Sequence, residues 1–389
     1  MMRHLKFNED NKVVDLHTHP HLKSYMFSRS MNKRKFLSRF FKHKFWPFSH
    51  RSTLEEIANA CDVSLATTYV LENEWVNDIP LIKFLTKLAP GFRKKVLSLG
   101  YYETAVAMMD HLEEGIASSG IVLSRTQQQL QANLKNNIPT LVHAVEGAHS
   151  LQSKETDWRD NCADFAQRGI ASITLAHFYP NEFVKGCVFP YPEAERKHLK
   201  NYKKLVSTWD EDSGLTDKGV ELVELMLEKK ILIDVTHLSI NGRKQVYDIV
   251  DHHNKDCAVF ASHVGAKGVH RISYNLQDWE LQWLGSRGCA VGIIFMNSWI
   301  SPYQPAGNGL KHIEDTLSYI VNTAGADLPA IGTDLDGFTD PPDEIETIKD
   351  LPLVTKHLMD MGYGDDIIRR FLGGNAIRLL SNGWGNAKE

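Results

Sequence analysis

The sequence has few cysteines, no long apolar run and little excess charge, and each shortage argues against a class of protein. Its five cysteines include no C-x-x-C pair, so neither a zinc knuckle nor a disulfide framework is indicated, and we expect a reducing, cytoplasmic compartment. No stretch reaches the roughly 18 apolar residues of a transmembrane segment, and residues 1–10 are polar where a secretory signal would be apolar. The net charge of -4 gives no general attraction to nucleic acid or to an anionic membrane.

The composition is that of an ordinary soluble globular protein that can bury a full core. Apolar residues make up 42% and charged residues 24% of the 389 residues. This length suits one large domain or two smaller ones, and α/β barrels often exceed about 250 residues as a single domain. Because neither a low-complexity tract nor a linker interrupts the chain, we expect one domain over residues 1–389.

Short apolar, β-branched runs alternate with amphipathic helical stretches along most of the chain. Continuous apolar runs are typical of parallel strands that helices cover. Eight such units predict an α/β fold, a (β/α)8 TIM barrel, with a doubly wound open sheet as the alternative. The expected strands are Val13–Thr18, Val63–Val70, Pro139–Val145, Ala171–Ala176, Ile231–Thr236, Ala258–Ser262, Ala290–Phe295 and Ala330–Thr333. The expected helices include Thr53–Ala60, Thr104–Leu134, Asp217–Lys229, Gly242–His253, Lys311–Asn322 and Ile345–Met359.

The segment that follows the first expected strand, residues 21–51, mixes basic and aromatic side chains and contains no acidic residue. Such a mixture could bind nucleic acid, an anionic lipid surface or an acidic substrate. We favour the plainer interpretation, an insertion whose aromatic side chains pack on the main domain while its charges stay in water. Because the insertion leaves from a strand end, a lid over a site and a subunit interface are its two candidate roles.

A barrel places its chemistry at the C-terminal ends of its strands, and these ends are rich in histidine and carboxylate. Alternate side chains of an extended strand share one face, so His17 and His19 can hold one metal ion. A single histidine at a strand end is more often a structural group, but six strand ends of this kind favour a metal site. Zinc suits these ligands, with manganese, iron or cobalt as alternatives. The candidates are His17, His19, Glu146, His177, His237, His263 and Asp334.

Two further carboxylates accompany these candidates. Asp15 shares the face of His17, and we expect it to be a buried acceptor that orients a ligand imidazole. Asp336 lies two residues after Asp334, and because Gly337 follows it, a turn-shaping role and a catalytic role both stay open.

Seven passages follow one another along the chain: Val145–Ser150, Ser172–His177, Gly214–Thr216, Leu232–Ser239, Phe260–His263, Ile331–Gly337 and Leu372–Arg378. Each motif is short, but together with the opening strand the motifs span most of the chain. In this order they resemble the renal or membrane dipeptidases, the M19 metallopeptidases with an amidohydrolase-like barrel. The resemblance implies a hydrolase that cleaves the amide bond of a dipeptide with a metal-activated water at a dinuclear zinc site.

The resemblance also implies a role for each matching residue. His17 would bind the first metal ion, and Glu146 would bridge the two ions. His237 and His263 would complete the second site. Asp334 would lie near the metals as a proton acceptor, and His177 would polarise the scissile carbonyl.

Two residues depart from the family pattern. His19 stands where the family usually has aspartate, which removes a negative charge from the first metal site and makes a single metal ion an alternative. Tyr274 stands before Asn275 where the family has an arginine for the carboxylate of the substrate. Arg271, three residues earlier, is the candidate replacement, and a surface position is its plainer interpretation.

Three functions therefore stay open. The first is dipeptide hydrolysis, and the second is another amidohydrolase reaction, on an N-acyl amino acid, a lactone or a cyclic amide. The third is an inactive barrel that binds metal and acts through the insertion. We expect a small-molecule substrate, no nucleic-acid partner and no transmembrane segment, with a homodimer as the possible assembly.

Overall fold

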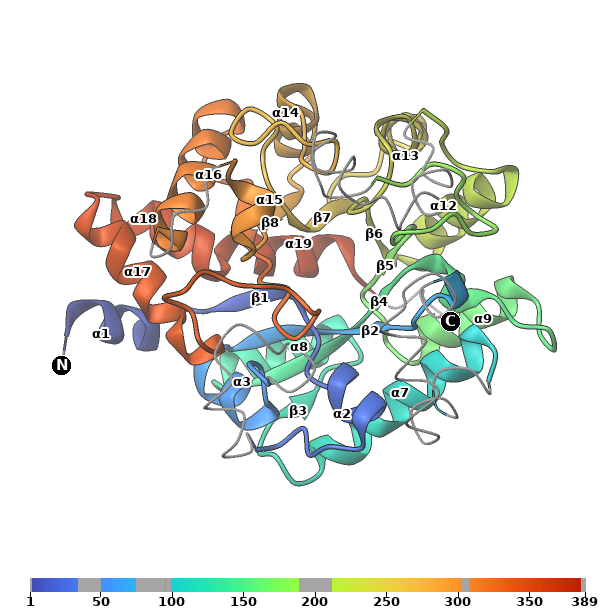
Figure 1. Cartoon of the computed structure of the whole chain (residues 1–389), viewed down its shortest axis with the longest axis horizontal. Coiled ribbons are helices and arrows are strands. Elements are labelled where there is room, and N and C mark those ends of the chain that lie inside the picture. The colour runs from blue at the N-terminus through green and yellow to red at the C-terminus, as the bar shows by residue number, and fades with distance from the viewer. Residues whose placement is uncertain are drawn as a thin grey trace.

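The computed structural model describes residues 2–33, 50–74, 95, 99–188, 212–302 and 308–385. Its parallel strands form a barrel surrounded by helices (Figure 1). The hydrogen-bonded order is β2-β1-β9-β8-β7-β6-β5-β4, and β2 also pairs with β4, which closes the ring. This closure confirms the predicted (β/α)8 barrel and excludes the open sheet. The barrel strands are β1 (Val14–Thr18), β2 (Val63–Tyr69), β4 (Thr140–Glu146), β5 (Ser172–Thr174), β6 (Leu232–Asp234), β7 (Val259–Val264), β8 (Ala290–Ile293) and β9 (Pro329–Ile331).

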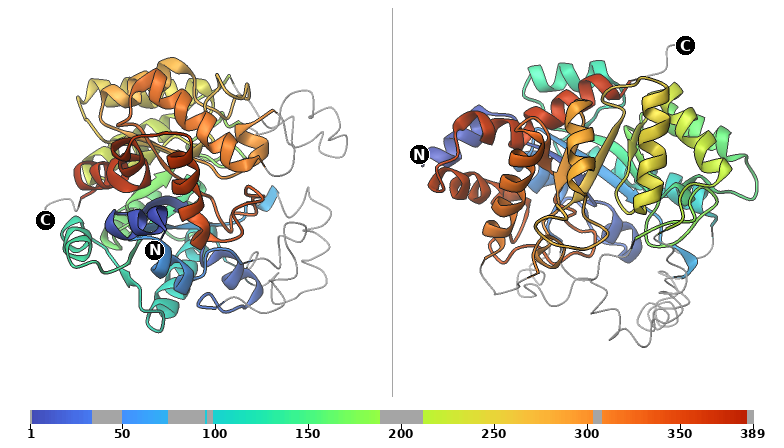
Figure 2. Two further views of the ribbon diagram at one scale, coloured as in Figure 1. Left: turned by 90° about the vertical axis from the view of Figure 1, so that its left-hand side faces the viewer. Right: turned by 90° about the horizontal axis from the view of Figure 1, so that it is seen from above.

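Helices lie between successive strands on the outside of the barrel, and α1 packs beside α17 at the edge seen in Figure 2. None of the helices in the described part of the chain is long and apolar enough to cross a membrane. The α-helices are α1 (Arg3–Asp10), α2 (Leu22–Phe27), α3 (Leu54–Ala60), α7 (Tyr101–Ile116), α8 (Gln127–Lys135), α9 (Trp158–Gln167), α12 (Asp217–Lys229), α13 (Ile240–His252), α14 (Asp278–Ser286), α15 (Asn297–Ile300), α16 (Gly309–Ala324), α17 (Leu351–Asp360), α18 (Asp365–Arg369) and α19 (Asn375–Gly383).

The core divides into two buried clusters. The larger lies largely between the strands and the surrounding helices. The smaller joins residues of β1, β2, β4 and β6–β9 with Leu379, Leu380 and Trp384 at the end of the described chain. Helix α19 therefore lies across the N-terminal end of the barrel, behind the strands in Figure 1. The opposite end, where the strands finish, is left for polar side chains.

The expected strands agree with the observed ones to within two residues at each end, but the expected helix Thr104–Leu134 is wrong. This stretch contains α7, the short strand β3 (Val122–Leu123) and α8. Gly120 between α7 and β3 has φ +75°, a conformation that an α-helix does not allow. Thr126 then caps α8 by accepting a hydrogen bond from the Gln129 amide. The stretch Ile345–Met359 is likewise divided, into a 3₁₀ turn (Ile348–Asp350) and α17.

The residue 21–51 insertion is described at its two ends, and residues 34–49 lie outside the described residues. Both ends meet the buried carboxylate of Asp336. The Lys23 Nζ lies 2.9 Å from one carboxylate oxygen. The backbone amides of Arg51 and Ser52 and the Ser52 hydroxyl donate to the other oxygen. Asp336 therefore fastens the insertion to the barrel.

The two roles left open for Asp336 are decided by these contacts in favour of shaping the loop. Its backbone has φ +68°, as expected in a tight turn. Burial by itself would raise the pKa of Asp336, but Lys23 and His50 lower it below its ordinary value. The carboxylate is therefore ionised and fully occupied by donors.

Replacing Asp336 with alanine should destabilise the protein. The Lys23 ammonium would stay buried without this carboxylate, and removing one partner of a buried ion pair typically costs about 3–5 kcal/mol. Denaturant unfolding followed by circular dichroism would measure the change. The matched control is Asp360→Ala, which breaks an exposed pair with Lys356 and should leave the unfolding midpoint unchanged. Equal midpoints for both variants would contradict the anchoring role.

Candidate metal centre

The side chain at the centre of the candidate site is Glu146, the last residue of β4. It is 3% exposed, so its carboxylate needs compensating partners. The Nε2 atom of His17 lies 3.6 Å from Glu146 Oε1, and the Nε2 atom of His19 lies 3.4 Å from Oε2. The two Nε2 atoms are 3.1 Å apart. The end of β1 thus directs a pair of imidazoles at this carboxylate, as alternation along the strand predicts.

A second pair of imidazoles approaches the same carboxylate from β6 and β7. The Nε2 atoms of His237 and His263 lie 3.2 and 3.4 Å from Glu146 Oε1. They are 3.2 Å from each other. His237 follows β6 in a tight turn with φ +68°, and Ser239 caps α13 two residues later, which fixes the position of this turn.

Asp334, three residues beyond β9, lies beside the first pair. Its Oδ1 atom is 3.2 Å from His19 Nε2 and 3.9 Å from His17 Nε2. Burial, together with the negative charge of Glu146, raises the pKa of Asp334 well above its ordinary value. The six residues that the sequence predicts as metal ligands are therefore brought together at one end of the barrel.

The tautomers of the imidazoles test whether these residues fit a metal ion. Nδ1 of His19 lies 3.0 Å from the carbonyl oxygen of Thr67, which can only accept, so Nδ1 carries the hydrogen. Burial lowers the pKa of His19, which favours the neutral ring. Nε2 then directs a lone pair at the oxygens of Glu146 and Asp334. Lone pairs and carboxylates repel one another at this distance unless a cation lies between them, so the donor set fits bound metal.

The Nδ1 atom of His263 also carries the hydrogen, and its partners are residues without a predicted role. The Ser262 hydroxyl donates to Asp234 Oδ2 at 2.6 Å and can therefore accept the Nδ1 hydrogen of His263, 2.7 Å away. Nε2 of His263 is left free to bind a cation. Asp234 is the last residue of β6, and its place in the motif Leu232–Ser239, which also contains His237, was the available signal.

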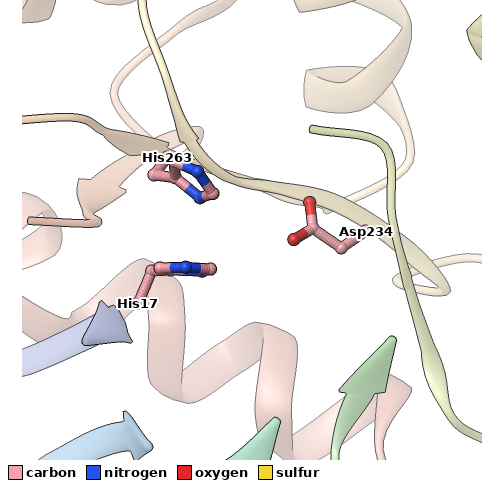
Figure 3. A group of neighbouring side chains, drawn as sticks. All are labelled: His17, Asp234 and His263. Carbon is pink, nitrogen blue, oxygen red and sulfur yellow. The ribbon is translucent and has the colours of Figure 1, made fainter. Parts of the chain in front are cut away.

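Asp234 also lies near His17, and the donor atoms of Asp234, His17 and His263 are all within 4.8 Å of one another. Figure 3 shows the carboxylate directed toward the two rings. Its oxygens already accept hydrogen bonds from the hydroxyls of Thr174, Thr236 and Ser262 and from the amides of Thr236 and Ser262. We therefore assign Asp234 to positioning rather than to metal binding.

Asp15 was expected to orient a ligand imidazole, and the structure gives it different partners. Its carboxylate accepts from the backbone amide of His17 and from the amide and hydroxyl of Thr333. Asp15 thus joins the ends of β1 and β9 through the backbone. Burial raises its pKa to about 6, although these hydrogen bonds lower it in part.

His177 completes the site three residues beyond β5. Its Nε2 atom lies 3.9 Å from Glu146 Oε1, and its Nδ1 atom lies 3.0 Å from Glu72 Oε1. Glu72 follows β2 and had no predicted role. Its sequence context, a charged stretch after an apolar run, gave no sign of it.

Arg271, Tyr274 and Asn275, the other candidate substrate-binding residues, differ in exposure and in partners. Arg271 is exposed at the surface. Tyr274 is fully buried, packs 5.1 Å from the His237 ring and donates its hydroxyl hydrogen to the His263 carbonyl. Asn275 accepts from the Gly265 amide and donates to two backbone carbonyls, so its side chain holds the loop after β7.

A closed (β/α)8 barrel with imidazoles and carboxylates converging at its C-terminal end is typical of a metal-dependent enzyme. The model of the membrane dipeptidase family, peptidase family M19, matches residues 103–386. The chain therefore belongs to this family of metallo-dipeptidases. The match begins after β1 and β2, so His17, His19 and Glu72 lie outside it.

Two curated proteins are similar over most of the chain. A protein encoded in the pqqA 5' region of Klebsiella pneumoniae is 29% identical over 252 residues, which are 64% of this chain and 84% of that protein. Dipeptidase aclJ of Aspergillus oryzae is 25% identical over 238 residues, 61% of this chain and half (50%) of that protein.

Solved structures share the fold. A metallopeptidase from Rhodobacter sphaeroides, bound to a phosphinate mimic of the dipeptide L-Ala-D-Ala, superposes with a TM-score of 0.72 at 20% identity, covering 96% of this chain and 99% of that one. The probable dipeptidase PvdM from Pseudomonas aeruginosa gives 0.71 at 15% identity, covering 97% of each chain.

The contacts behind His263 generate a prediction about metal affinity. The variants Ser262→Ala and Asp234→Asn should each weaken zinc binding by about 10- to 100-fold, because they disturb the acceptor of the His263 Nδ1 hydrogen. Competition with a chromogenic chelator would measure the affinity. Thr316→Ala, which removes a buried hydroxyl bonded within α16, is the control. Unchanged affinity in both site variants would show that this relay does not support the metal.

Proposed function

We propose that the protein hydrolyses the amide bond of dipeptides at a dinuclear metal site at the mouth of the barrel. One observation carries the proposal: four imidazoles surround the buried carboxylate of Glu146. Its Oε1 atom faces His17, His237 and His263, and its Oε2 atom faces His19. This arrangement supports a carboxylate that bridges two cations. Zinc is the metal that the ligand set favours, with manganese, iron and cobalt as alternatives.

The ligands divide into two groups. His17 and His19 would hold the first ion, with Asp334 beside them, and His237 and His263 would hold the second. The imidazole of His19 lacks the negative charge of the aspartate usual in the family, and the 3.2 Å approach of Asp334 to His19 Nε2 supports a compensating carboxylate there. When bound, the ions would lower the pKa of a water molecule and stabilise negative charge on the attacked carbonyl.

Two residues of the chain would handle the proton and the oxyanion. Asp334, whose Oδ1 atom lies 3.2 Å from His19 Nε2, would accept a proton from the attacking water and return it to the leaving amine. His177 lies on the other side of Glu146 and would donate from Nε2 to the oxygen that gains negative charge.

The residues considered for binding the terminal carboxylate of the substrate favour a second candidate function. Tyr274 has its hydroxyl engaged with the His263 carbonyl and Arg271 is exposed, so neither supports recognition of a terminal carboxylate. Another amidohydrolase reaction, on a substrate without that group, is therefore the second proposal. Comparing a dipeptide with its C-terminal amide distinguishes the two, because a dipeptidase of the usual kind should prefer the free acid. An inactive barrel is disfavoured by the assembled ligand set.

We also propose a single domain over residues 1–389, a reducing cytoplasmic location and a homodimer. The residue 21–51 insertion is either a lid over the site or the subunit interface. The five cysteines are buried free thiols, which supports the reducing location. Sedimentation of the full chain would test the homodimer.

Metal content and turnover should depend together on Glu146. We expect two metal ions per chain in protein purified without chelator, falling sharply in Glu146→Ala because both pairs of imidazoles lose their shared carboxylate. Elemental analysis gives the metal content, and L,L- and L,D-dipeptides with zinc or manganese give the turnover.

The matched control for this experiment is Glu182→Ala, which removes an exposed glutamate paired with Lys218. It should keep both the metal and the activity. One metal or none in the wild type, with no turnover after metal is added, would contradict the dinuclear dipeptidase.

A further inference from the structure

Two barrel strands, β2 and β8, have no predicted site residue at their C-terminal ends. The end of β2 carries Tyr69, its last residue, and Glu72 in the loop beyond. We propose that Glu72, which accepts a hydrogen bond from Tyr69, is the positioning residue of His177 and directs the Nε2 atom of His177 at the reacting carbonyl. The proposal rests on the proposed function in one respect, namely that His177 meets the substrate.

The Glu72 carboxylate is held by both of its oxygens. Oε1 lies 3.0 Å from Nδ1 of His177, and Oε2 accepts a hydrogen bond from the Tyr69 hydroxyl. Glu72 is 3% exposed and Tyr69 is 5% exposed, so both contacts are shielded from water. The rings of Tyr69 and His177 also lie against each other, with centroids 4.3 Å apart. These contacts fix both the position and the rotation of the imidazole.

The charge of Glu72 determines which nitrogen of His177 faces the site. Burial by itself would raise the pKa of Glu72, but His177 and the Tyr69 hydroxyl lower it to about 2, so the group is a carboxylate. A carboxylate can only accept, and Nδ1 of His177 must donate to it. Nε2 therefore faces the site, 3.9 Å from Glu146.

A buried carboxylate on one nitrogen of an imidazole also stabilises positive charge on the ring. The ring can then carry a hydrogen on Nε2 as well, and this hydrogen can be donated to the oxygen of an attacked carbonyl. Without Glu72, a neutral ring could turn or take the other tautomer. The contact between Glu72 and His177 joins β2 to β5 through residues that lie far apart in the sequence.

A purely structural role for Glu72 makes a different prediction from a positioning role. A structural residue supports the loop after β2, so its loss lowers stability and affects metal binding, KM and kcat without distinction. A positioning residue acts through His177 alone. Its removal lowers kcat, leaves metal content and KM nearly unchanged, and has no further effect once His177 is gone.

The test compares Glu72→Gln, His177→Ala and the double variant in the metal-loaded enzyme with a dipeptide substrate. Glutamine keeps the shape and can still accept from Nδ1, but it lacks the charge. We expect kcat to fall about 10- to 100-fold with KM within about twofold. Glu72→Asp should recover part of the loss, and the double variant should be no slower than His177→Ala. The control is Glu74→Gln, which changes an exposed glutamate two residues further along the chain.

A second measurement keeps the test independent of activity and of Glu72 variants that fold poorly. The Nδ1 hydrogen of His177 should give a downfield proton resonance, identified by its loss in His177→Ala and shifted upfield in Glu72→Gln. The milder variant Tyr69→Phe keeps the Glu72 contact and should shift the same resonance by a smaller amount.

The possible outcomes separate this proposal from the proposed function. A wild type that cleaves no dipeptide contradicts the dipeptidase, while the resonance still tests the contact between Glu72 and His177. An active wild type whose Glu72→Gln variant retains kcat overturns the positioning role. The positioning role is also overturned if the losses in kcat add in the double variant, or if Glu72→Gln leaves the His177 resonance unshifted.

Discussion

The site depends on one buried carboxylate, Glu146, and on the imidazoles directed at it from three other strands. An ionised group in a protein interior is costly unless opposite charge or donors surround it. Neutral imidazoles with lone pairs toward the carboxylate do not meet this need, whereas cations between them do. The partners come from β1, β6 and β7, so the barrel must close in a single register for the carboxylate to be balanced. The fold and the candidate metal centre therefore depend on the same strand register.

Carboxylates recur behind the candidate ligands, and each is held by donors from elsewhere in the barrel. Asp15 joins the backbone of β1 to Thr333, and Asp234 collects hydroxyls and amides from three neighbouring strands. Glu72 accepts hydrogen bonds from Nδ1 of His177 and from the Tyr69 hydroxyl. Asp234, through Ser262, and Glu72 limit how far the imidazoles of His263 and His177 can turn, whereas Asp15 fixes the backbone of His17. Such limits matter because metal ions and oxyanions are recognised over a few tenths of an ångström.

The sequence predicts the strands and the histidines at their ends well, because both signals are local. A run such as residues 139–145 is mostly apolar, and Glu146 follows it directly. The feature that was missed at the site joins distant residues, because Glu72 after β2 meets His177 after β5. The division of residues 104–134 was missed because one glycine outweighed an otherwise helical pattern. Tyr274 illustrates a third limit, since its identity gave no hint that its hydroxyl binds the His263 carbonyl.

The pairing of β1 with β9 has a consequence for how the protein comes into being. Asp15 lies beside Ile331 in this pairing, and the Asp334 amide donates to the His17 carbonyl at 2.9 Å. His17 and Asp334, both candidate metal ligands, thus lie far apart along the chain. The segment that carries Asp334 must leave the ribosome before the two can meet, and contacts of such long sequence separation form slowly. Under the proposed function, metal binding at this pair would therefore follow the formation of the barrel.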